Sequence, residues 1–418
     1  MKLEDINLLD RDVFTNGVPH EWFTYLRANA PVWFHEEPGD GRGFWVITKH
    51  DDVTTVGHDG KLFSSDQANG GVVMIEDPPE EERKRMEEMS AAAGKLMLMI
   101  DPPEHTRYRK LVNRGFTPRM IKRLEPHLRE MSVNILEAAI AKGDSDFVVD
   151  VAAELPLQAI AELIGVPQED RHKIFDWSNR MIGSEDPEYA VSADHLMEAQ
   201  IEMFMYAQQL GEERRKEPKD DIISALLAAD IDGDQLSAAD FNMFFLLLAV
   251  AGNETTRNAI AHGMNALLDN PDQYAELVAD PSLVPGAVEE ILRWASPVLF
   301  FRRNVTADTV LRGQQLKAGD KVTIWYVSAN RDEDVFDDPF RFDIHRDPNP
   351  HIAFGGGGPH HCLGAHLARM EMTLLFEELV KRVPYVERLG AADRLRSNFI
   401  GGIKHLPVRF HAQAPAAV

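Results

Sequence analysis

The stretch Phe354-Gly355-Gly356-Gly357-Gly358-Pro359-His360-His361-Cys362-Leu363-Gly364-Ala365-His366-Leu367-Ala368-Arg369 contains the only cysteine in 418 residues. Four successive glycines lead into this thiol, and an apolar helix is predicted to begin at Cys362. The unpaired N–H groups and the positive dipole end of a helix N-terminus favour a thiolate. Glycines let the backbone turn tightly and leave room for a large flat group. The stretch therefore predicts a thiolate that binds a metal.

The composition is typical of a globular enzyme with a sizeable core, since 44% of the residues are hydrophobic and 27% are charged. A single cysteine excludes an intramolecular disulfide and fits a reducing compartment. The start, Met1 to Asp5, lacks the basic and apolar regions of a signal peptide. The longest apolar run, Met243 to Ala251, has nine residues, against roughly 20 for a membrane span. We therefore expect a cytoplasmic protein without a membrane anchor.

The formal charge of -24 argues against a nucleic-acid partner, because nucleic acids bind to basic faces. The exception is the stretch from His105 to Arg129, in which Glu125 is the only acid. Its basic residues are Arg107, Arg109, Lys110, Arg114, Arg119, Lys122, Arg123 and Arg129. Such a face could dock an acidic protein, or it could be an ordinary solvated helix face.

The chain has no internal repeat and no linker long enough to divide it, so residues 1–418 are predicted to form one large domain. Helical spacing of apolar residues predicts a helical core over about 105–295 and 362–382. Segments typical of strands lie mainly in 30–70, 300–330 and 385–411. The predicted fold class is mainly α with a small β-rich lobe.

A long helix is predicted from about Ser237, which can cap it, to Asn270, before Pro271. Phe241 to Ala251 is apolar all round, which indicates a helix that crosses the interior. The next residues, Gly252-Asn253-Glu254-Thr255-Thr256, suit a buried helix poorly, because Gly costs about 1 kcal/mol relative to Ala and Thr can bond back to a carbonyl. Such a breach of local rules favours a functional role, and the alternative is a polar turn on the helix surface.

Cys362 is ambiguous when it is considered alone. Together with His360, His361 and His366 it could form a zinc site, although structural zinc sites normally use more than one thiolate. A lone cysteine is also commonly a buried, unreactive residue, but four preceding glycines would then serve no purpose.

The remaining short patterns are equally weak one by one. Glu290 and Arg293 stand at i, i+3, where such pairs are usually solvated. Pro339 to Phe342 could be a plain turn. His105 and Arg109, at i, i+4, could bind two anionic oxygens or face solvent.

The order of these patterns resembles that of a cytochrome P-450, a haem-thiolate monooxygenase, of the soluble bacterial type. The motifs are His105-x-x-x-Arg109, Ala251-Gly252-x-Glu254-Thr255, Glu290-x-x-Arg293, Pro339-x-Arg341-Phe342 and the glycine loop into Cys362-Leu363-Gly364. The resemblance covers essentially the whole chain. In one departure, the family usually has Phe seven residues before the cysteine, where this chain has Gly355, and Phe354 lies one residue further away.

The resemblance implies haem b as the cofactor, with Cys362 as the axial ligand of its iron. The other residues that it places at the cofactor are His105, Arg109, Arg303 and His360 at the haem propionates, and Phe354 and Gly364 in the cysteine loop. Arg302 is an alternative to Arg303. The resemblance also implies that Glu290, Arg293 and Arg341 form a buried ion network that supports the cysteine loop.

For catalysis, the resemblance implies that Glu254 and Thr255 deliver protons to dioxygen, which is the cosubstrate. No flavin or nicotinamide motif is present, so electrons are expected from a reduced ferredoxin. It would dock on the basic face around Arg107–Arg129.

Substrate contacts implied by the resemblance are almost all apolar, namely Val72, Met74, Met97, Leu98, Val250, Ala251, Val298, Leu299 and Ile400. They could also be ordinary core residues. We expect a lipophilic substrate, either a sterol side chain or a methyl-branched lipid, which would be hydroxylated at a C–H bond. The alternatives are a terpene hydroxylase, a peroxide-dependent haem-thiolate enzyme, and a haem-based sensor or carrier.

Overall fold

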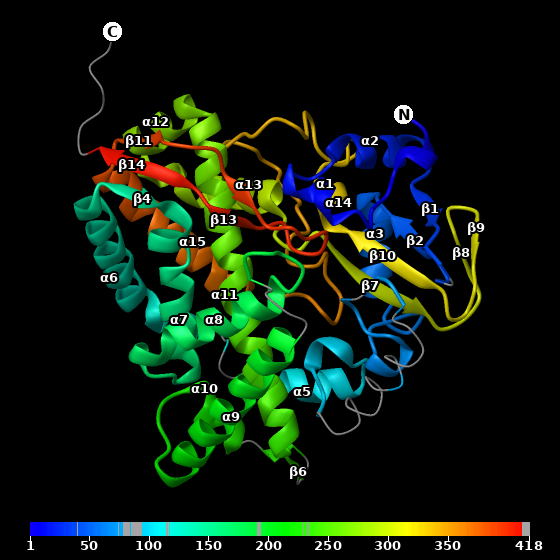
Figure 1. Cartoon of the computed structure of the whole chain (residues 1–418), viewed down its shortest axis with the longest axis horizontal. Helices are drawn as coiled ribbons and strands as arrows, with labels where there is room; N and C mark the ends of the chain where they lie inside the picture. The colour runs from blue at the N-terminus through cyan, green and yellow to red at the C-terminus, as the bar shows by residue number, and fades with distance from the viewer. Residues whose placement is uncertain are drawn as a thin grey trace.

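The computed structural model describes residues 1–39, 41–73, 75–77, 84, 94–113, 116, 118–189, 194–228, 230–231 and 234–411. Within these ranges the chain forms a large helical part and a smaller β-rich part, which lie side by side in Figure 1. This arrangement agrees with the predicted fold class. No helix in the described ranges is both long and apolar enough to cross a membrane.

The helices are α1 (Arg11–Thr15), α2 (His20–Asn29), α3 (His50–His58), α5 (Glu104–Val112), α6 (Pro118–Lys142), α7 (Glu154–Ile164), α8 (Arg171–Ile182), α9 (Asp194–Lys216), α10 (Ile222–Leu227), α11 (Ala238–Asp269), α12 (Pro271–Ala279), α13 (Val284–Ala295), α14 (Tyr326–Ala329) and α15 (Ala365–Arg382). The strands are β1 (Val32–His35), β2 (Phe44–Ile47), β3 (Phe63–Ser64), β4 (Asp144–Asp146), β5 (Asp230–Ile231), β6 (Asp234–Gln235), β7 (Phe300–Val305), β8 (Thr309–Leu311), β9 (Gln314–Leu316), β10 (Lys321–Trp325), β11 (Tyr385–Arg388), β12 (Asp393–Arg394), β13 (Ile403–His405) and β14 (Pro407–His411).

The main sheet has the strand order β1-β2-β10-β7-β3. Strand β10 pairs parallel with β2 and antiparallel with β7, and all five of its residues are buried. A central strand that is buried on both faces anchors its neighbours. Strand β7 carries Arg302 and Arg303, so this sheet fixes the position of both arginines.

A second sheet joins distant parts of the chain in the order β11-β14-β4. Strand β4 lies within 105–295, where the sequence predicted a mainly helical core and did not indicate this strand, and the short strands β5 and β6 lie there too. Val408 pairs with Ser145 across this sheet. Such a long-range pairing leaves no mark on local periodicity, which explains the miss.

Helix α11 runs through the centre of the molecule (Figure 1) and packs against α7, α8, α9 and α13. The Ser237 hydroxyl accepts the Asp240 N–H at 3.0 Å, as the predicted cap requires. The helix ends at Asp269 and α12 begins at Pro271, which confirms both predicted boundaries. It remains helical through Gly252–Thr256, where the Thr255 hydroxyl donates to the Ala251 carbonyl at 2.9 Å.

Candidate active site

A cavity separates α11 from the segment that leads into α15. Helix α11 contributes Leu247, Leu248, Ala251, Gly252, Thr255, Thr256 and Ala259 to its wall. The opposite wall consists of Ala353, Phe354, Gly355, Gly357, His360, His361, Cys362, Leu363, Gly364, Leu367, Ala368, Glu371 and Met372. The cavity thus brings together the helix and the cysteine loop that the sequence singled out.

The four glycines shape the cysteine loop. All four have positive φ, between 57° at Gly356 and 99° at Gly357, a region that other residues rarely adopt. A Cβ on Gly357 would lie 2.6 Å from Nε2 of His58. The loop closes where the Cys362 N–H donates to the Phe354 carbonyl at 2.9 Å. The loop therefore accommodates one more residue between Phe354 and Cys362 than the family usually has, and Phe354 still lines the cavity.

The thiol of Cys362 is open to the cavity. Helix α15 begins at Ala365, three residues after the predicted start, so Cys362 precedes the helix. Burial raises the pKa of the Cys362 thiol. The backbone N–H groups of Gly364 and Ala365 and the charges of Arg109 and Arg369 lower it by less. The backbone groups at the start of α15 therefore favour the thiolate, as predicted, but desolvation outweighs them and the net shift of the pKa is upward.

A basic cluster of four predicted residues lines the same cavity: His105, Arg109, Arg303 and His360. The two imidazole rings lie 4.2 Å apart. Within the described residues, Nδ1 of His105 and Nε2 of His360 are buried without a hydrogen-bond partner. Burial, helped by Arg109, lowers the pKa of His105 to about 4. Unpaired imidazole nitrogens beside the buried Arg303 and the partly buried Arg109 favour an anionic ligand in this corner.

Of the two arginines on strand β7, only Arg303 lines the cavity. Arg303 lines the cavity and its Nη1 donates to the Arg302 carbonyl at 2.7 Å. The Arg302 side chain instead donates from Nε to Oδ1 of Asn304 at 2.9 Å. Successive side chains of a strand point to opposite faces, so only one of the two reaches the cavity.

These observations fit the cofactor that the sequence implied. A haem needs a flat apolar slot, a ligand for its iron and donors for two carboxylates. The cavity offers apolar side chains from α11, the Cys362 thiol and the basic cluster. Cys362 would hold the iron, and His105, Arg109, Arg303 and His360 would hold the carboxylates.

Thr255 and Glu254 are separated on α11. Thr255 lines the cavity, whereas Glu254 is buried away from it and forms an ion pair with Arg257. Arg257 also donates to Oδ1 of Asn179 on α8 at 2.7 Å. Burial raises the pKa of Glu254, and Arg257 opposes that shift. The carboxylate must therefore leave this ion pair, or act through water, to serve Thr255.

Of the predicted substrate contacts, Met97, Leu98, Ala251 and Val298 line the cavity. Met74 lies outside the described residues. The others, Val72, Val250, Leu299 and Ile400, do not line the cavity. Cavity-lining residues that the sequence did not indicate include Phe116, Ile160, Leu247, Leu248, Ala259, Leu292, Pro297 and Phe301. Those on α11 could have been found from their helical spacing with Ala251 and Thr255.

The predicted ion network exists, but one member is wrong. Arg293 and Glu290 are fully buried and form two hydrogen bonds of 2.7 Å. Nη1 of Arg293 donates to the Asn330 and Pro339 carbonyls at 2.9 Å. The Arg341 side chain is 67% exposed, and Arg346 occupies the predicted place, with Nε 3.2 Å from Oε2 of Glu290. The backbone carbonyl of Arg341, rather than its side chain, accepts from Arg293.

Glu371 on α15 is a cavity residue that the sequence reading did not single out. It is 2% exposed, and Oε2 has no partner within the described residues. Burial raises its pKa to about 8. The acid is therefore mostly protonated at neutral pH. The one sequence signal for its place in the cavity is its helical spacing of four residues from Leu367, which lines the same cavity.

Glu371→Gln is expected to stabilise the protein at alkaline pH. The folded carboxyl binds its proton up to about pH 8, whereas an unfolded one loses it near 4.3. Stability is therefore lost as pH rises through this interval. At pH 8.5 the free energy of unfolding of the variant should exceed that of the wild type by about 5 kcal/mol, so the variant should unfold at a higher temperature. The difference should shrink at pH 5.

Glu378→Gln is a matched control on the same helix. Its partners Arg129, Lys381 and Arg382 hold the pKa of Glu378 below its ordinary value, so this change should destabilise the protein at pH 8.5. Equal unfolding temperatures for wild type and Glu371→Gln at both pH values would contradict the buried-acid assignment.

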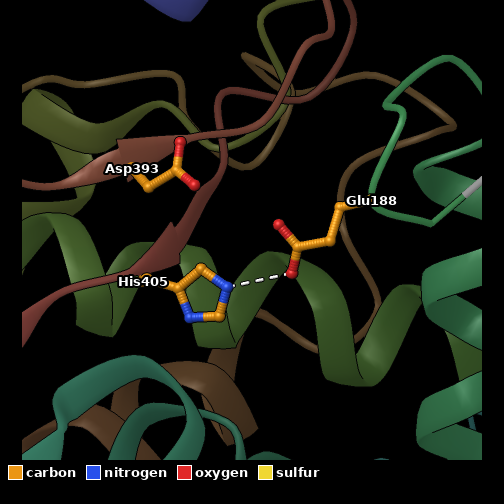
Figure 2. A group of neighbouring side chains, drawn as sticks. All are labelled: Glu188, Asp393 and His405. Carbon is orange, nitrogen blue, oxygen red and sulfur yellow. Dashed lines mark hydrogen bonds and ion pairs between the residues drawn. The ribbon is translucent and has the colours of Figure 1, made fainter.

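One further cluster, outside the cavity, has the composition of a metal site (Figure 2). Within the described ranges, metal-ligand atoms come close together only at Glu188, Asp393 and His405, so the zinc alternative for Cys362 is not supported. Nε2 of His405 contacts Glu188 at 2.9 Å and Nδ1 contacts Asp146 at 2.5 Å. The Lys404 ammonium lies 2.9 Å from Glu188 and 3.4 Å from Asp393. With both imidazole nitrogens engaged and a cation already present, the cluster is an ion-pair network.

Comparison with known proteins places these features in a family. The family model described as Cytochrome P450 matches residues 157–383. A Rhodococcus jostii protein named steroid C26-monooxygenase is 46% identical over 97% of this chain and 85% of its own length. A methyl-branched lipid omega-hydroxylase of Mycobacterium bovis is 43% identical over 97% of this chain and 95% of its own.

Solved structures agree with the fold. A Mycobacterium marinum cytochrome P450 in complex with pseudoionone has a TM-score of 0.88 and 39% identity, covering 98% of this chain and 99% of its own. A Bacillus megaterium relative in complex with corticosterone has a TM-score of 0.80 and 35% identity, covering 94% of this chain and 98% of its own. The predicted fold is confirmed.

Proposed function

The chain belongs to the cytochrome P450 family of monooxygenases, and from this premise we propose that it hydroxylates a C–H bond of a sterol side chain or a methyl-branched lipid. The observation that carries the proposal is the placement of Cys362 in one wall of a cavity whose opposite wall, on α11, is apolar apart from Thr255 and Thr256. Relatives named for steroids and for methyl-branched lipids are 46% and 43% identical to it.

Haem, when bound, supplies the activation of O2 at its iron. The roles of this chain's own residues follow from their positions. Cys362 would ligate the iron, and the basic cluster would neutralise the carboxylates. The apolar side chains of α11 and of Val298 would exclude water and orient a lipophilic substrate.

Proton delivery is assigned to Thr255 and Glu254. The Thr255 hydroxyl lines the cavity and donates to the Ala251 carbonyl, so its oxygen lone pairs can accept a hydrogen bond from a water molecule in the cavity. Glu254 keeps Oε1 free of any partner in the described chain. Release from Arg257 would let this carboxylate pass protons to the Thr255 side.

Thr255→Ala is expected to uncouple oxygen consumption from hydroxylation. Oxygen uptake should continue, while product formed per O2 falls about tenfold or more and hydrogen peroxide rises. Parallel measurement of O2, peroxide and product tests this. Thr255→Ser, which keeps the hydroxyl, is the control and should stay coupled. Tight coupling in Thr255→Ala would refute the proton role.

We also propose that a reduced ferredoxin supplies the electrons and docks on the basic face. Lys110 on α5 and Lys122 and Arg123 on α6 are exposed. Two predicted members differ from expectation: Arg109 faces the cavity, and Arg129 is paired with Glu377 and Glu378. The side chains of Arg114 and Arg119 lie outside the described residues.

A Lys110→Glu, Lys122→Glu double variant is expected to raise the KM for ferredoxin about tenfold at low ionic strength and to weaken its salt dependence. Reduction rates at varied ferredoxin and salt concentrations measure both. Lys317→Glu, on the loop after β9, is the control because Lys317 is also exposed but lies outside the basic face, paired with Asp308. Equal effects from the two variants would exclude this docking face.

The substrate class is tested by ligand difference spectroscopy of the holoenzyme. Cholesterol-like sterols and methyl-branched fatty acids are expected to give the low-to-high-spin shift of the Soret band with micromolar affinity. Terpenoids form the second candidate class, because the relative bound to pseudoionone is 39% identical. A shift with terpenoids alone would overturn the sterol and lipid proposal.

A further inference from the structure

A tyrosine on the cavity wall has no role in the site described so far. Tyr326 is the first residue of α14, directly after β10, and is 3% exposed. It lines the cavity together with Arg303 and Gly355. Its ring packs edge-on against Phe301, with the centroids 6.1 Å apart. A Cβ on Gly355 would lie 3.9 Å from the Tyr326 hydroxyl oxygen, so this hydroxyl reaches the cysteine loop.

The Tyr326 hydroxyl makes no hydrogen bond with any residue that the structure describes. Buried tyrosines usually place this group on a partner. Tyr274 illustrates the rule, since its hydroxyl donates to the Val383 carbonyl at 2.7 Å. Because Tyr326 lines the cavity, a group bound in the cavity is the expected hydrogen-bond partner of its hydroxyl.

The charges around Tyr326 select the kind of partner. Arg303 is its charged neighbour, and the two groups influence each other's pKa. Burial raises the pKa of the Tyr326 hydroxyl, so the group stays protonated and can donate. His360, which also feels the charge of Arg303, has an unpartnered Nε2 in the same wall. A donor beside a cation and other unpaired donors suits a carboxylate, which can accept several hydrogen bonds on two oxygens.

We propose that the Tyr326 hydroxyl donates a hydrogen bond to a carboxylate of the bound haem, next to Arg303, and thereby helps to retain and position the cofactor. The inference rests on the haem site of the proposed function. It adds Tyr326 to the cofactor-binding residues that the sequence implied, and it explains why a buried hydroxyl has no partner among the residues that the structure describes.

The test compares the Tyr326→Phe and wild-type holoenzymes. Haem transfer to excess apomyoglobin, followed at the Soret band, should be about tenfold faster in the variant, because a charge-assisted hydrogen bond is lost. The midpoint potential of the haem should fall, since a less neutralised carboxylate favours the oxidised iron. The unfolding temperature of the haem-free protein should stay unchanged, since the hydroxyl has no partner within the described part of the chain.

Tyr274→Phe is the control. It removes a hydroxyl of the same chemistry from a site remote from the cavity, so it should lower the unfolding temperature and leave the potential unchanged. A Tyr326→Phe enzyme with wild-type haem transfer and potential would overturn the inference. Failure of the wild type to bind haem would instead overturn the proposed function, and it would be seen before any variant is made.

Discussion

Cys362→Ala is expected to abolish hydroxylation, with a loss of at least about a thousandfold in turnover. The thiol is the only cysteine side chain in the protein and it faces the cavity from the glycine loop. Thiolate donation is what allows a haem iron to cleave dioxygen, and alanine cannot donate. Turnover of an accepted substrate with a ferredoxin system measures the loss, and metal analysis gives the iron content.

His366→Ala is the matched control for this prediction. His366 is exposed at the start of α15 and does not line the cavity. Its loss should leave iron content and turnover close to wild type. A Cys362→Ala protein that still hydroxylates substrate at a comparable rate would contradict the role assigned to the thiol.

Arg293→Gln is expected to destabilise the fold by about 3–5 kcal/mol, because removing one partner of a buried ion pair leaves an uncompensated charge. Glu290 is fully buried, and the change also removes donors from the Asn330 and Pro339 carbonyls. We expect a low soluble yield and a large fall in unfolding temperature. Thermal unfolding of the purified holoenzyme measures it.

Arg341→Gln separates the observed network from the predicted one. Its side chain is exposed and lies 3.9 Å from Asp343. Such a surface ion pair contributes about 1 kcal/mol or less to the free energy of unfolding. The variant should unfold close to wild type. If it were as unstable as Arg293→Gln, the buried network would include the Arg341 side chain and the assignment of Arg346 would be wrong.

Features with strong local signals could be predicted from the sequence. The capped helix α11 carries its own start and stop residues, Ser237 and Pro271, and an apolar run that indicates a buried helix. The four glycines demanded a backbone that only glycine adopts readily, which is what their positive φ values show. The order of the motifs then identified the family, although each motif alone was ambiguous.

Features that depend on side-chain direction could not be predicted. Arg341 and Arg346 lie five residues apart in the same loop, so the sequence does not indicate which guanidinium pairs with Glu290. Packing decides this, and the structure has Arg346 in that position. Glu254 adjoins Thr255 in sequence, but adjacent helix residues point about 100° apart, so it meets Arg257 instead of the cavity. The position of Tyr326 beside Arg303 depends on the pairing of β10 with β7, so the sequence alone did not indicate a role for it.

The central claim is that the Cys362 sulfur ligates the iron of a bound haem. The most direct test is the absorption spectrum of the dithionite-reduced protein exposed to carbon monoxide. We predict the long-wavelength Soret band that thiolate-ligated haem gives, and its loss in Cys362→Ala. A band at the shorter wavelength of histidine-ligated haem, or no haem absorption at all, would contradict the account.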